Sequence, residues 1–90
     1  MREILQTPTF GKQAKKLHAN QRKDLEEAIR AIAANPALGK AKKGDLLGVY
    51  VYKFRMLNQL TLLAYQYTVE ELLLFALGSH KNFYRDLKKY

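Results

Sequence analysis

Three segments in the second half of this 90-residue chain have the composition of β-strands and follow one another closely. They are residues 49–57, 60–67 and 72–77, and all are rich in β-branched, aromatic or leucine side chains. The connections between them are short, and short connections join antiparallel strands, whereas parallel strands need a long crossover. The pattern therefore predicts an antiparallel meander as the second half of the fold.

The first half of the chain is typical of a short strand followed by two helices. Residues 3–6 form the candidate strand, and Thr7 stands before a proline, as an N-cap does at a helix start. Asn20 is the expected cap of the second helix, which the Asn35-Pro36 step ends. Apolar side chains fall on one face of each predicted helix. They are Phe10, Ala14 and Leu17 in the first helix and Leu25, Ala28, Ile29, Ile32 and Ala33 in the second.

Length and composition support one small domain that spans residues 1–90, because the hydrophobic fraction of 48% is enough for one core. The predicted fold class is α+β: an N-terminal strand and a helical hairpin packed on a twisted antiparallel sheet of about four strands. The loop 37–48 has room for a further short strand. Residues 82–90 are expected to form a short basic tail or helix, with Phe83 and Leu87 facing inward.

The charge of the chain indicates a polyanion as its partner. Lys plus Arg total 16 and Asp plus Glu total 8, which gives a net charge of +8 and a pI near 9.8. A small domain of this charge is expected to bind nucleic acid first, although some small proteins are simply basic. With no cysteine and two histidines, we expect no disulfide, no metal site and no cofactor. The sequence shows no signal peptide and no run long enough to span a membrane, so we expect a cytoplasmic protein.

Alternate side chains along residues 49–57 point to opposite faces of the sheet. One face carries Tyr50, Tyr52, Phe54 and Met56, and the other carries Val49, Val51, Lys53 and Arg55. The first set is apolar enough to meet the helices. The second set is expected to form a basic, open face.

Lys53 and Arg55 are candidate phosphate-binding residues. If residues 58–59 form a two-residue turn, Arg55 lies opposite Leu62 and Lys53 lies opposite Ala64, with no acid opposite either cation. Unpaired cations are costly to desolvate, which suits a site that meets phosphate. The equally weighted alternative is an ordinary solvated sheet face whose long side chains cover apolar surface.

His80 is a candidate proton-transfer group. It comes after the strand-like run 72–77, and Lys81, Tyr84 and Arg85 follow it closely. An imidazole titrates near neutral pH, so at the end of a strand beside cations it is suited to move protons next to a phosphate. A histidine in such a place is more often a surface or capping group.

The order of strand, two helices, antiparallel meander and basic tail resembles the RelE/ParE superfamily of bacterial toxins from type II toxin–antitoxin systems. The stretches that carry the resemblance are residues 46–55 (LLGVYVYKFR), 62–65 (LLAY) and 76–80 (ALGSH). The resemblance covers nearly the whole chain.

The likeness is greatest to the RelE branch, and within it to YafQ-like toxins with a Gly-Thr-His or Gly-Ser-His end. Members of the RelE branch cut mRNA in the ribosomal A site without a metal, by helping the ribose 2′-hydroxyl attack the adjacent phosphate. The resemblance implies that Lys53 and Arg55 hold the phosphate, that His80 is catalytic, and that Tyr84 stacks on a base. The implied RNA-binding residues are Lys53, Arg55, Lys81, Tyr84 and Arg85.

The chain departs from the RelE branch at Leu62, where many members carry another arginine, so one phosphate contact is either missing or supplied elsewhere, by Arg85 or Lys81. Two alternatives stay open. The ParE branch inhibits DNA gyrase and lacks the nuclease residues, and a non-enzymatic basic module would bind only its antitoxin and operator DNA. The combination of Lys53, Arg55 and His80 favours the nuclease. The implied partners are a cognate antitoxin with an acidic or amphipathic segment, the ribosome, mRNA and operator DNA through the antitoxin complex, with no membrane.

Overall fold

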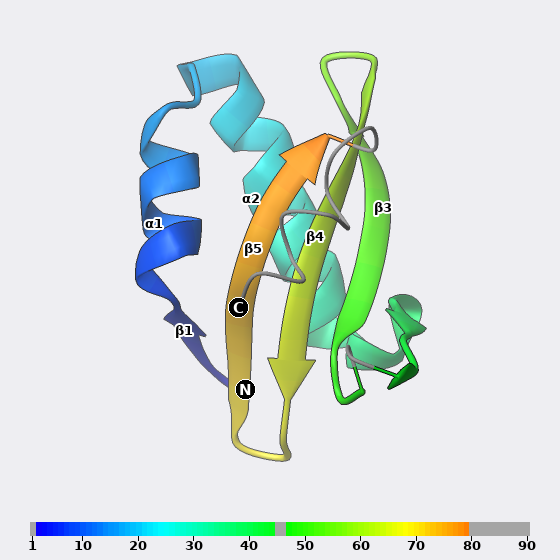
Figure 1. Cartoon of the computed structure of the whole chain (residues 1–90). Coiled ribbons are helices and arrows are strands. Elements are labelled where there is room, and N and C mark those ends of the chain that lie inside the picture. The colour runs from blue at the N-terminus through cyan, green and yellow to red at the C-terminus, as the bar shows by residue number, and fades with distance from the viewer. Residues whose placement is uncertain (1, 45–46, 80–90) are drawn as a thin grey trace.

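The computed structural model describes residues 2–44 and 47–79 and shows two helices on one face of a five-stranded sheet (Figure 1). The elements in chain order are β1 (Glu3–Gln6), α1 (Pro8–Lys15), α2 (Ala19–Ala34), the 3-10 turn η1 (Pro36–Leu38), β2 (Lys40–Ala41), β3 (Tyr50–Met56), β4 (Gln59–Tyr67) and β5 (Glu71–Ser79). The predicted α+β class and the helical hairpin are confirmed. The short strand expected within the loop 37–48 is β2.

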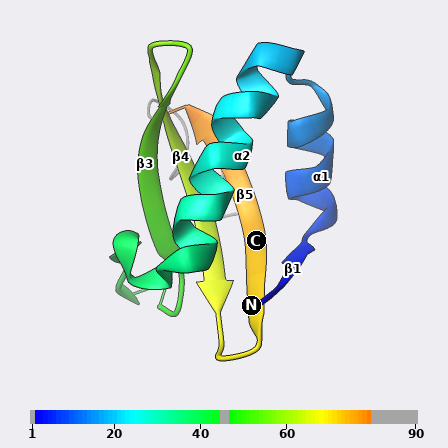
Figure 2. The same cartoon turned by 180° about the vertical axis from the view of Figure 1, so that it is seen from behind.

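The sheet has the strand order β1-β5-β4-β3-β2. Strands β3, β4 and β5 form the predicted antiparallel meander, and β2 is antiparallel to β3. Strand β1 lies on the far side of β5 and runs parallel to it, with Glu3 paired to Glu71 and Gln6 to Leu74. The sheet is therefore mixed, and it has one strand more than the expected four. Both helices lie on the same side of it, with α2 crossing the central strands (Figure 2).

The predicted turn of the β3–β4 hairpin was wrong by one residue. Leu57 and Asn58 form the turn, with φ values of 51° and 69°, so Met56 pairs with Gln59. Positive φ at both central residues is the geometry whose twist matches that of the flanking strands. The N–H of Leu57 donates to Asp24 Oδ2 at 3.0 Å, which holds the turn against α2.

This turn changes the partners of the two candidate cations. Arg55 lies opposite Leu60 and Lys53 opposite Leu62, two positions away from the predicted pairing with Leu62 and Ala64. Because the shift is an even number of residues, every side chain keeps its predicted face of the sheet.

The start of α1 is as predicted, whereas the start of α2 is not. Thr7 is the N-cap of α1, and its Oγ1 accepts the N–H of Phe10 at 3.1 Å. Helix α2 begins at Ala19 with His18 as N-cap, so the prediction that Asn20 caps it was wrong. The N–H of His18 donates to the side chain of Gln21, the third residue of the helix, at 2.9 Å. This bond stabilises a helix that begins at Ala19, two residues earlier than predicted.

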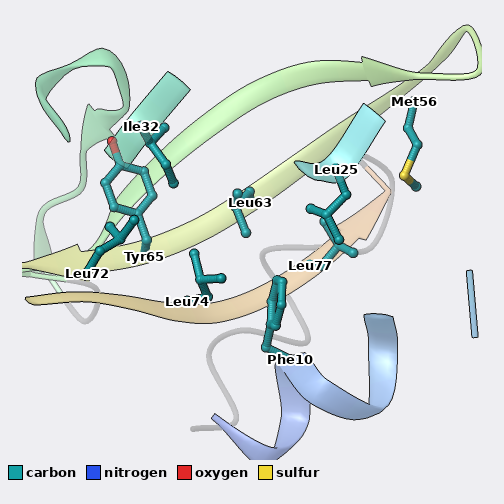
Figure 3. Packing of buried hydrophobic residues seen from close by; sticks show 9 residues of the cluster. All are labelled: Phe10, Leu25, Ile32, Met56, Leu63, Tyr65, Leu72, Leu74 and Leu77. Carbon is teal, nitrogen blue, oxygen red and sulfur yellow. The ribbon is translucent and has the colours of Figure 1, made fainter. Parts of the chain in front are cut away.

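The main core lies between the helices and the sheet (Figure 3). It is formed by Phe10, Leu25, Ile32, Met56, Leu63, Tyr65, Leu72, Leu74 and Leu77. The predicted helix face of β3 is confirmed, since Tyr50, Tyr52 and Phe54 pack against this cluster. A second apolar cluster lies on the other face of the sheet and consists of Val49, Val51, Leu62, Ala64 and Ala76.

Tyr65 ties the connection after α2 to the centre of the sheet. Its ring is fully buried, and its hydroxyl donates to the carbonyl of Pro36 and accepts the N–H of Gly39 at 2.8 Å. These two bonds satisfy the buried hydroxyl. They also place β2 beside the first residues of β3.

Candidate functional site

The candidate site lies on the outer face of the sheet, which we define as the face away from the helices, at its hairpin end. Lys53 and Arg55 extend from β3 onto this face, and both side chains are exposed. Val51, on the same face of the same strand, is only 3% exposed. The sequence suggested that the whole outer face is basic, and the structure shows that only part of it is. It is apolar and buried toward the start of β3 and cationic toward the hairpin.

The floor beside Lys53 is apolar. Lys53 lies opposite Leu62 on β4, and Leu62 lies opposite Gly78 on β5. Leu62 is fully buried, and Gly78 adds no side chain to the row. A cation beside such a floor has little competition from neighbouring polar groups, so it remains available for an anion.

Arg55 is held near the turn of the hairpin. Its Nη1 donates to the carbonyl of Asn58 at 3.2 Å. Among the described residues, neither Arg55 nor Lys53 has a carboxylate partner, which confirms that no acid lies opposite either cation in the sheet. Glu70 and Glu71 lie at the β4–β5 turn, at the other end of the sheet (Figure 1). Within the described part of the chain, two neighbouring positive charges are therefore left without a carboxylate partner, an arrangement that could bind one phosphate or two adjacent ones.

Strand β5 ends with Ser79 at this same end of the sheet. Ser79 pairs with Thr61, which in turn pairs with Phe54 between the two cations. His80, Lys81, Tyr84 and Arg85, together with the predicted inward residues Phe83 and Leu87, lie outside the described residues. Of the predicted site residues, the structure thus brings together Lys53 and Arg55.

A recess of about 290 Å³ opens on the helix side of the same end of the sheet. It is lined by Gln13, Lys16, Leu17, Gln21, Met56, Gln59, Thr61, Leu77, Gly78 and Ser79. Gln13 Oε1 accepts the N–H of Leu77 at 2.7 Å, where β1 no longer covers the edge of β5. Sequence reasoning did not identify Gln13 or Lys16, because no local pattern indicates that α1 approaches the end of β5.

In residues 2–44 and 47–79, no three His, Asp or Glu side chains converge in a way that could hold a metal ion. No helix in that part of the chain is long and apolar enough to cross a membrane.

Comparison with known proteins relates this arrangement to toxins. Residues 4–88 match the family model described as ParE-like toxin of type II bacterial toxin–antitoxin system. No curated protein matches the sequence.

Several solved structures share the fold. The chain is similar to one in the intact E. coli RelBE toxin–antitoxin complex, at 18% identity and a TM-score of 0.71, over 90% of this chain and 99% of that one. The chain is similar to the YoeB/ParE toxin from Agrobacterium tumefaciens at 18% identity and a TM-score of 0.68, over 87% of this chain and 98% of that one. It is similar to YafQ from E. coli at 19% identity and a TM-score of 0.63, over 93% of this chain and 99% of that one. At these identities the likeness shows a shared fold.

Proposed function

The chain belongs to the ParE-like toxins of type II bacterial toxin–antitoxin systems, and from this premise we propose that it is a ribosome-dependent mRNA endonuclease of the cytoplasm. The observation that carries the proposal is the pair of exposed cations, Lys53 and Arg55, on a sheet face where no described carboxylate neutralises them. Two exposed cations side by side above an apolar floor are suited to hold a phosphate and to stabilise charge that builds up on it.

In the proposed reaction, the 2′-oxygen of a ribose forms a bond to the adjacent phosphorus, and the bond from phosphorus to the 5′-oxygen breaks. The 2′-hydroxyl gives up its proton, and the leaving 5′-oxygen receives one. Lys53 and Arg55 stabilise the negative charge that builds up on the phosphoryl oxygens. His80, whose imidazole ring can accept or donate a proton, takes part in the proton transfer.

RNA binding and neutralisation complete the proposal. Lys81 and Arg85 add contacts to phosphates, and Tyr84 stacks on a base. The family indicates an antitoxin partner, and we propose that an acidic or amphipathic segment of it covers the cations of the outer face. The complex of the two proteins would bind operator DNA. Because phosphate contacts dominate binding to the ribosome and mRNA, the affinity is expected to fall steeply with salt.

The test is in vitro translation with the purified full-length protein, followed by primer extension to map mRNA ends. The wild type is expected to cut at A-site codons. Lys53→Ala and Arg55→Ala should each lower cleavage by about 10²-fold or more, as the loss of one transition-state donor does. His80→Ala should abolish the cuts. Lys23→Ala, which removes an exposed cation from α2, is the matched control and should cut normally.

The thermal midpoint of each variant separates chemistry from folding. Lys53 and Arg55 are exposed, so their removal should leave the midpoint nearly unchanged. Loss of cleavage with a large fall in the midpoint would mean that the residues are structural. Absence of ribosome-dependent cuts from the wild type would reject the proposal.

A second candidate function is inhibition of DNA gyrase. It is favoured by the description of the matching family model as ParE-like and by Leu62, which is buried and adds no third cation on β4. In that case growth arrest would persist in the His80→Ala variant, and the purified protein would inhibit gyrase in a supercoiling assay. A protein that neither cuts mRNA nor inhibits gyrase but binds an antitoxin would be the third alternative, a basic binding module.

A further inference from the structure

Strand β1 forms one edge of the sheet. The strand order β1-β5-β4-β3-β2 places it at the end, where it pairs with β5 alone. In Figure 1 it lies at the margin of the sheet, and no strand of the described residues lies on its far side. An unpaired edge of this kind is a template for pairing with another chain.

The backbone groups that point outward from this edge are those of the even-numbered residues. The N–H of Glu3 donates to the carbonyl of Glu70 at 2.8 Å, and the N–H of Thr7 donates to the carbonyl of Leu74 at 3.0 Å. Because successive residues of a strand direct their backbone groups to opposite sides, the odd-numbered residues of β1 bond to β5. The N–H and C=O of Ile4 therefore point away from the sheet, where no strand of the described residues meets them.

Side-chain contacts hold β1 in place at both of its ends. At the start, Arg2 Nε donates to the carbonyl of Thr68 at 2.7 Å, and the guanidinium lies 5.5 Å from the centre of the Tyr67 ring. At the end, Thr7 Oγ1 donates to the carbonyl of Phe75 at 2.7 Å. A strand that is already ordered loses little further freedom when it pairs, so the edge is pre-organised for binding.

Exposed apolar side chains gather along the same edge. Ile4 is 45% exposed, Leu5 is 37% exposed, and Val69, in the turn beside the start of β1, is 88% exposed. They are three of the six large apolar side chains exposed in the described part of the chain. The edge therefore offers apolar contact in addition to backbone hydrogen bonds, which favours a protein as its partner.

The charges at the two ends of β1 are opposite in sign. Glu3 pairs with Glu71 at the start of the strand, and Glu70 precedes Glu71 in the chain. Helix α1, which follows the end of the strand, exposes Lys12 and Lys15 and carries no acid. A second β1 laid antiparallel to the first brings the acids of each copy toward the lysines of the other, twice by symmetry. The charges therefore favour a second copy of this chain as the partner.

Hydrogen bonding and charge select one register for such a pair. Opposite residues of an antiparallel ladder either both bond to each other or both do not, so the even-numbered residues must face one another. The register with Ile4 opposite Ile4 of the second copy meets this condition and places Glu3 opposite Leu5. The next register in one direction places Glu3 opposite Glu3, which repel each other. The next in the other direction places Arg2 opposite Pro8, which has no N–H to donate.

We propose that two copies of this chain associate through β1, antiparallel about a two-fold axis at Ile4, and so form one continuous sheet. Because residues that face each other lie on the same face, the helices of both copies lie on one side and the two outer faces lie on the other. Lys53 and Arg55 lie on β3, beyond β5 and β4, and stay exposed. The dimer therefore presents both pairs of cations on one face.

The first experiment is disulfide cross-linking of the full-length protein. The chain has no cysteine, so Ile4→Cys introduces a single thiol. At the proposed axis the two Cα atoms of residue 4 lie about 5.5 Å apart, within the range that a disulfide spans. Leu5→Cys is the matched control, because in this register the two Cα atoms of residue 5 lie about 8 Å apart, which is too far.

Oxidised glutathione, which is reduced as the two thiols join, is the oxidant. Ile4→Cys is expected to form the linked dimer about tenfold faster than Leu5→Cys, because association holds its two thiols at a high effective concentration. Equal rates would indicate random collision, and a faster reaction of Leu5→Cys would indicate another register. Either result would overturn the proposal.

Hydrogen exchange followed by NMR tests the wild type without a cross-link. The amides of Ile4 and Gln6 should exchange more slowly at about 1 mM protein, the weak end of specific affinities, than at roughly 50 µM. The amide of Leu5 points toward β5 and should change little. Sedimentation at the same two concentrations gives the mass of the particle. A monomer at both concentrations, or protection that leaves out Ile4 and Gln6, would overturn the proposal.

Two variants separate backbone pairing from apolar contact. Ile4→Pro removes the outward N–H without removing a bond to β5, which an edge strand tolerates, and Ile4→Ala keeps the N–H. The proline variant should dimerise on the order of tenfold more weakly than the alanine variant, because each dimer loses two hydrogen bonds. Equal dimerisation of the two would contradict strand pairing. The thermal midpoint shows whether the proline variant folds, and the cysteine pair decides if it does not.

The dimer and the proposed nuclease are tested separately. None of these measurements uses RNA or the ribosome, so failure of the dimer leaves the nuclease proposal untouched. Absence of mRNA cleavage likewise leaves the dimer untouched, because the two-fold axis lies at β1 and the cations lie on β3.

Discussion

The backbone N–H of Gly39 donates to the hydroxyl of Tyr65 at 2.8 Å, and a Cβ on Gly39 would overlap with that hydroxyl and the ring behind it. The backbone after η1 therefore approaches the tyrosine as closely as it can. Only a residue without a side chain permits this approach. The contact joins the segment that leads into β2 to the central strand β4, and thereby holds β2 beside the first residues of β3.

Replacement of Gly39 by alanine should destabilise the protein by about 1–3 kcal/mol, the usual cost of overpacking, because the added methyl meets a ring that is buried on all sides. Urea unfolding monitored by circular dichroism measures this. Gly11→Ala is the control. The nearest atom to its new Cβ is the flexible end of Gln6 at 3.1 Å, and alanine favours the helix, so the midpoint should stay or rise. Equal stability of Gly39→Ala and wild type would contradict the close approach.

Removal of the Tyr65 hydroxyl leaves two buried backbone groups without a partner, the N–H of Gly39 and the carbonyl of Pro36. Tyr65→Phe should therefore cost about 1–3 kcal/mol, although the ring still fills its place in the core. The free energy of unfolding in urea is the readout. A double variant, Tyr65→Phe with Gly39→Ala, should lose less than the sum of the single losses, because the methyl then meets only the ring carbons at 2.8 Å and no longer the hydroxyl, which is its nearest neighbour. Strict additivity would argue against direct contact.

Stability should also depend on alkaline pH. Burial raises the pKa of Tyr65 above its ordinary value of 10.0, and a hydrogen bond with Tyr67 raises that of Tyr50. A raised pKa in the folded state favours the neutral phenol. The contribution of this phenol to the free energy of unfolding is therefore fully present below pH 10 and is lost as the pH rises through the pKa of the folded state. The unfolding free energy should therefore fall above pH 10, and less steeply in Tyr65→Phe. Equal slopes for the two proteins would show that Tyr65 is not the group responsible.

Thr7 serves two elements at once. Its Oγ1 accepts the N–H of Phe10 at the start of α1 and donates to the carbonyl of Phe75 on β5 at 2.7 Å. Thr7→Ala should destabilise the protein by about 1–2 kcal/mol, measured by thermal and urea unfolding, because it removes the cap and a bond across the fold. Thr7→Ser keeps the hydroxyl and should recover most of the loss. A serine variant as unstable as alanine would place the effect in the methyl group instead.

Local patterns predicted the elements of this fold because the forces that set them act over a few residues. Period-two alternation placed Lys53 and Arg55 together on the outer face, and the proline after Thr7 marked the start of α1. The start of α2 was predicted two residues late, since the side chain of Gln21 competes with that of Asn20 for the role that begins the helix. The hairpin turn was displaced because two adjacent residue pairs can each close a two-residue loop, and contact with Asp24 favours one of them.

The sequence by itself determined the α+β class, the order of helices and strands, the positive charge and the two cations that share a face. The tertiary structure alone decided that β1 pairs parallel with β5, that Gln13 covers the end of β5, and that the backbone of Ile4 lies on a free edge of the sheet. Each of these depends on groups that are distant in sequence, or on where a partner strand stops. Local preference carries no information about them, because they are set when the helices and the sheet pack around one core.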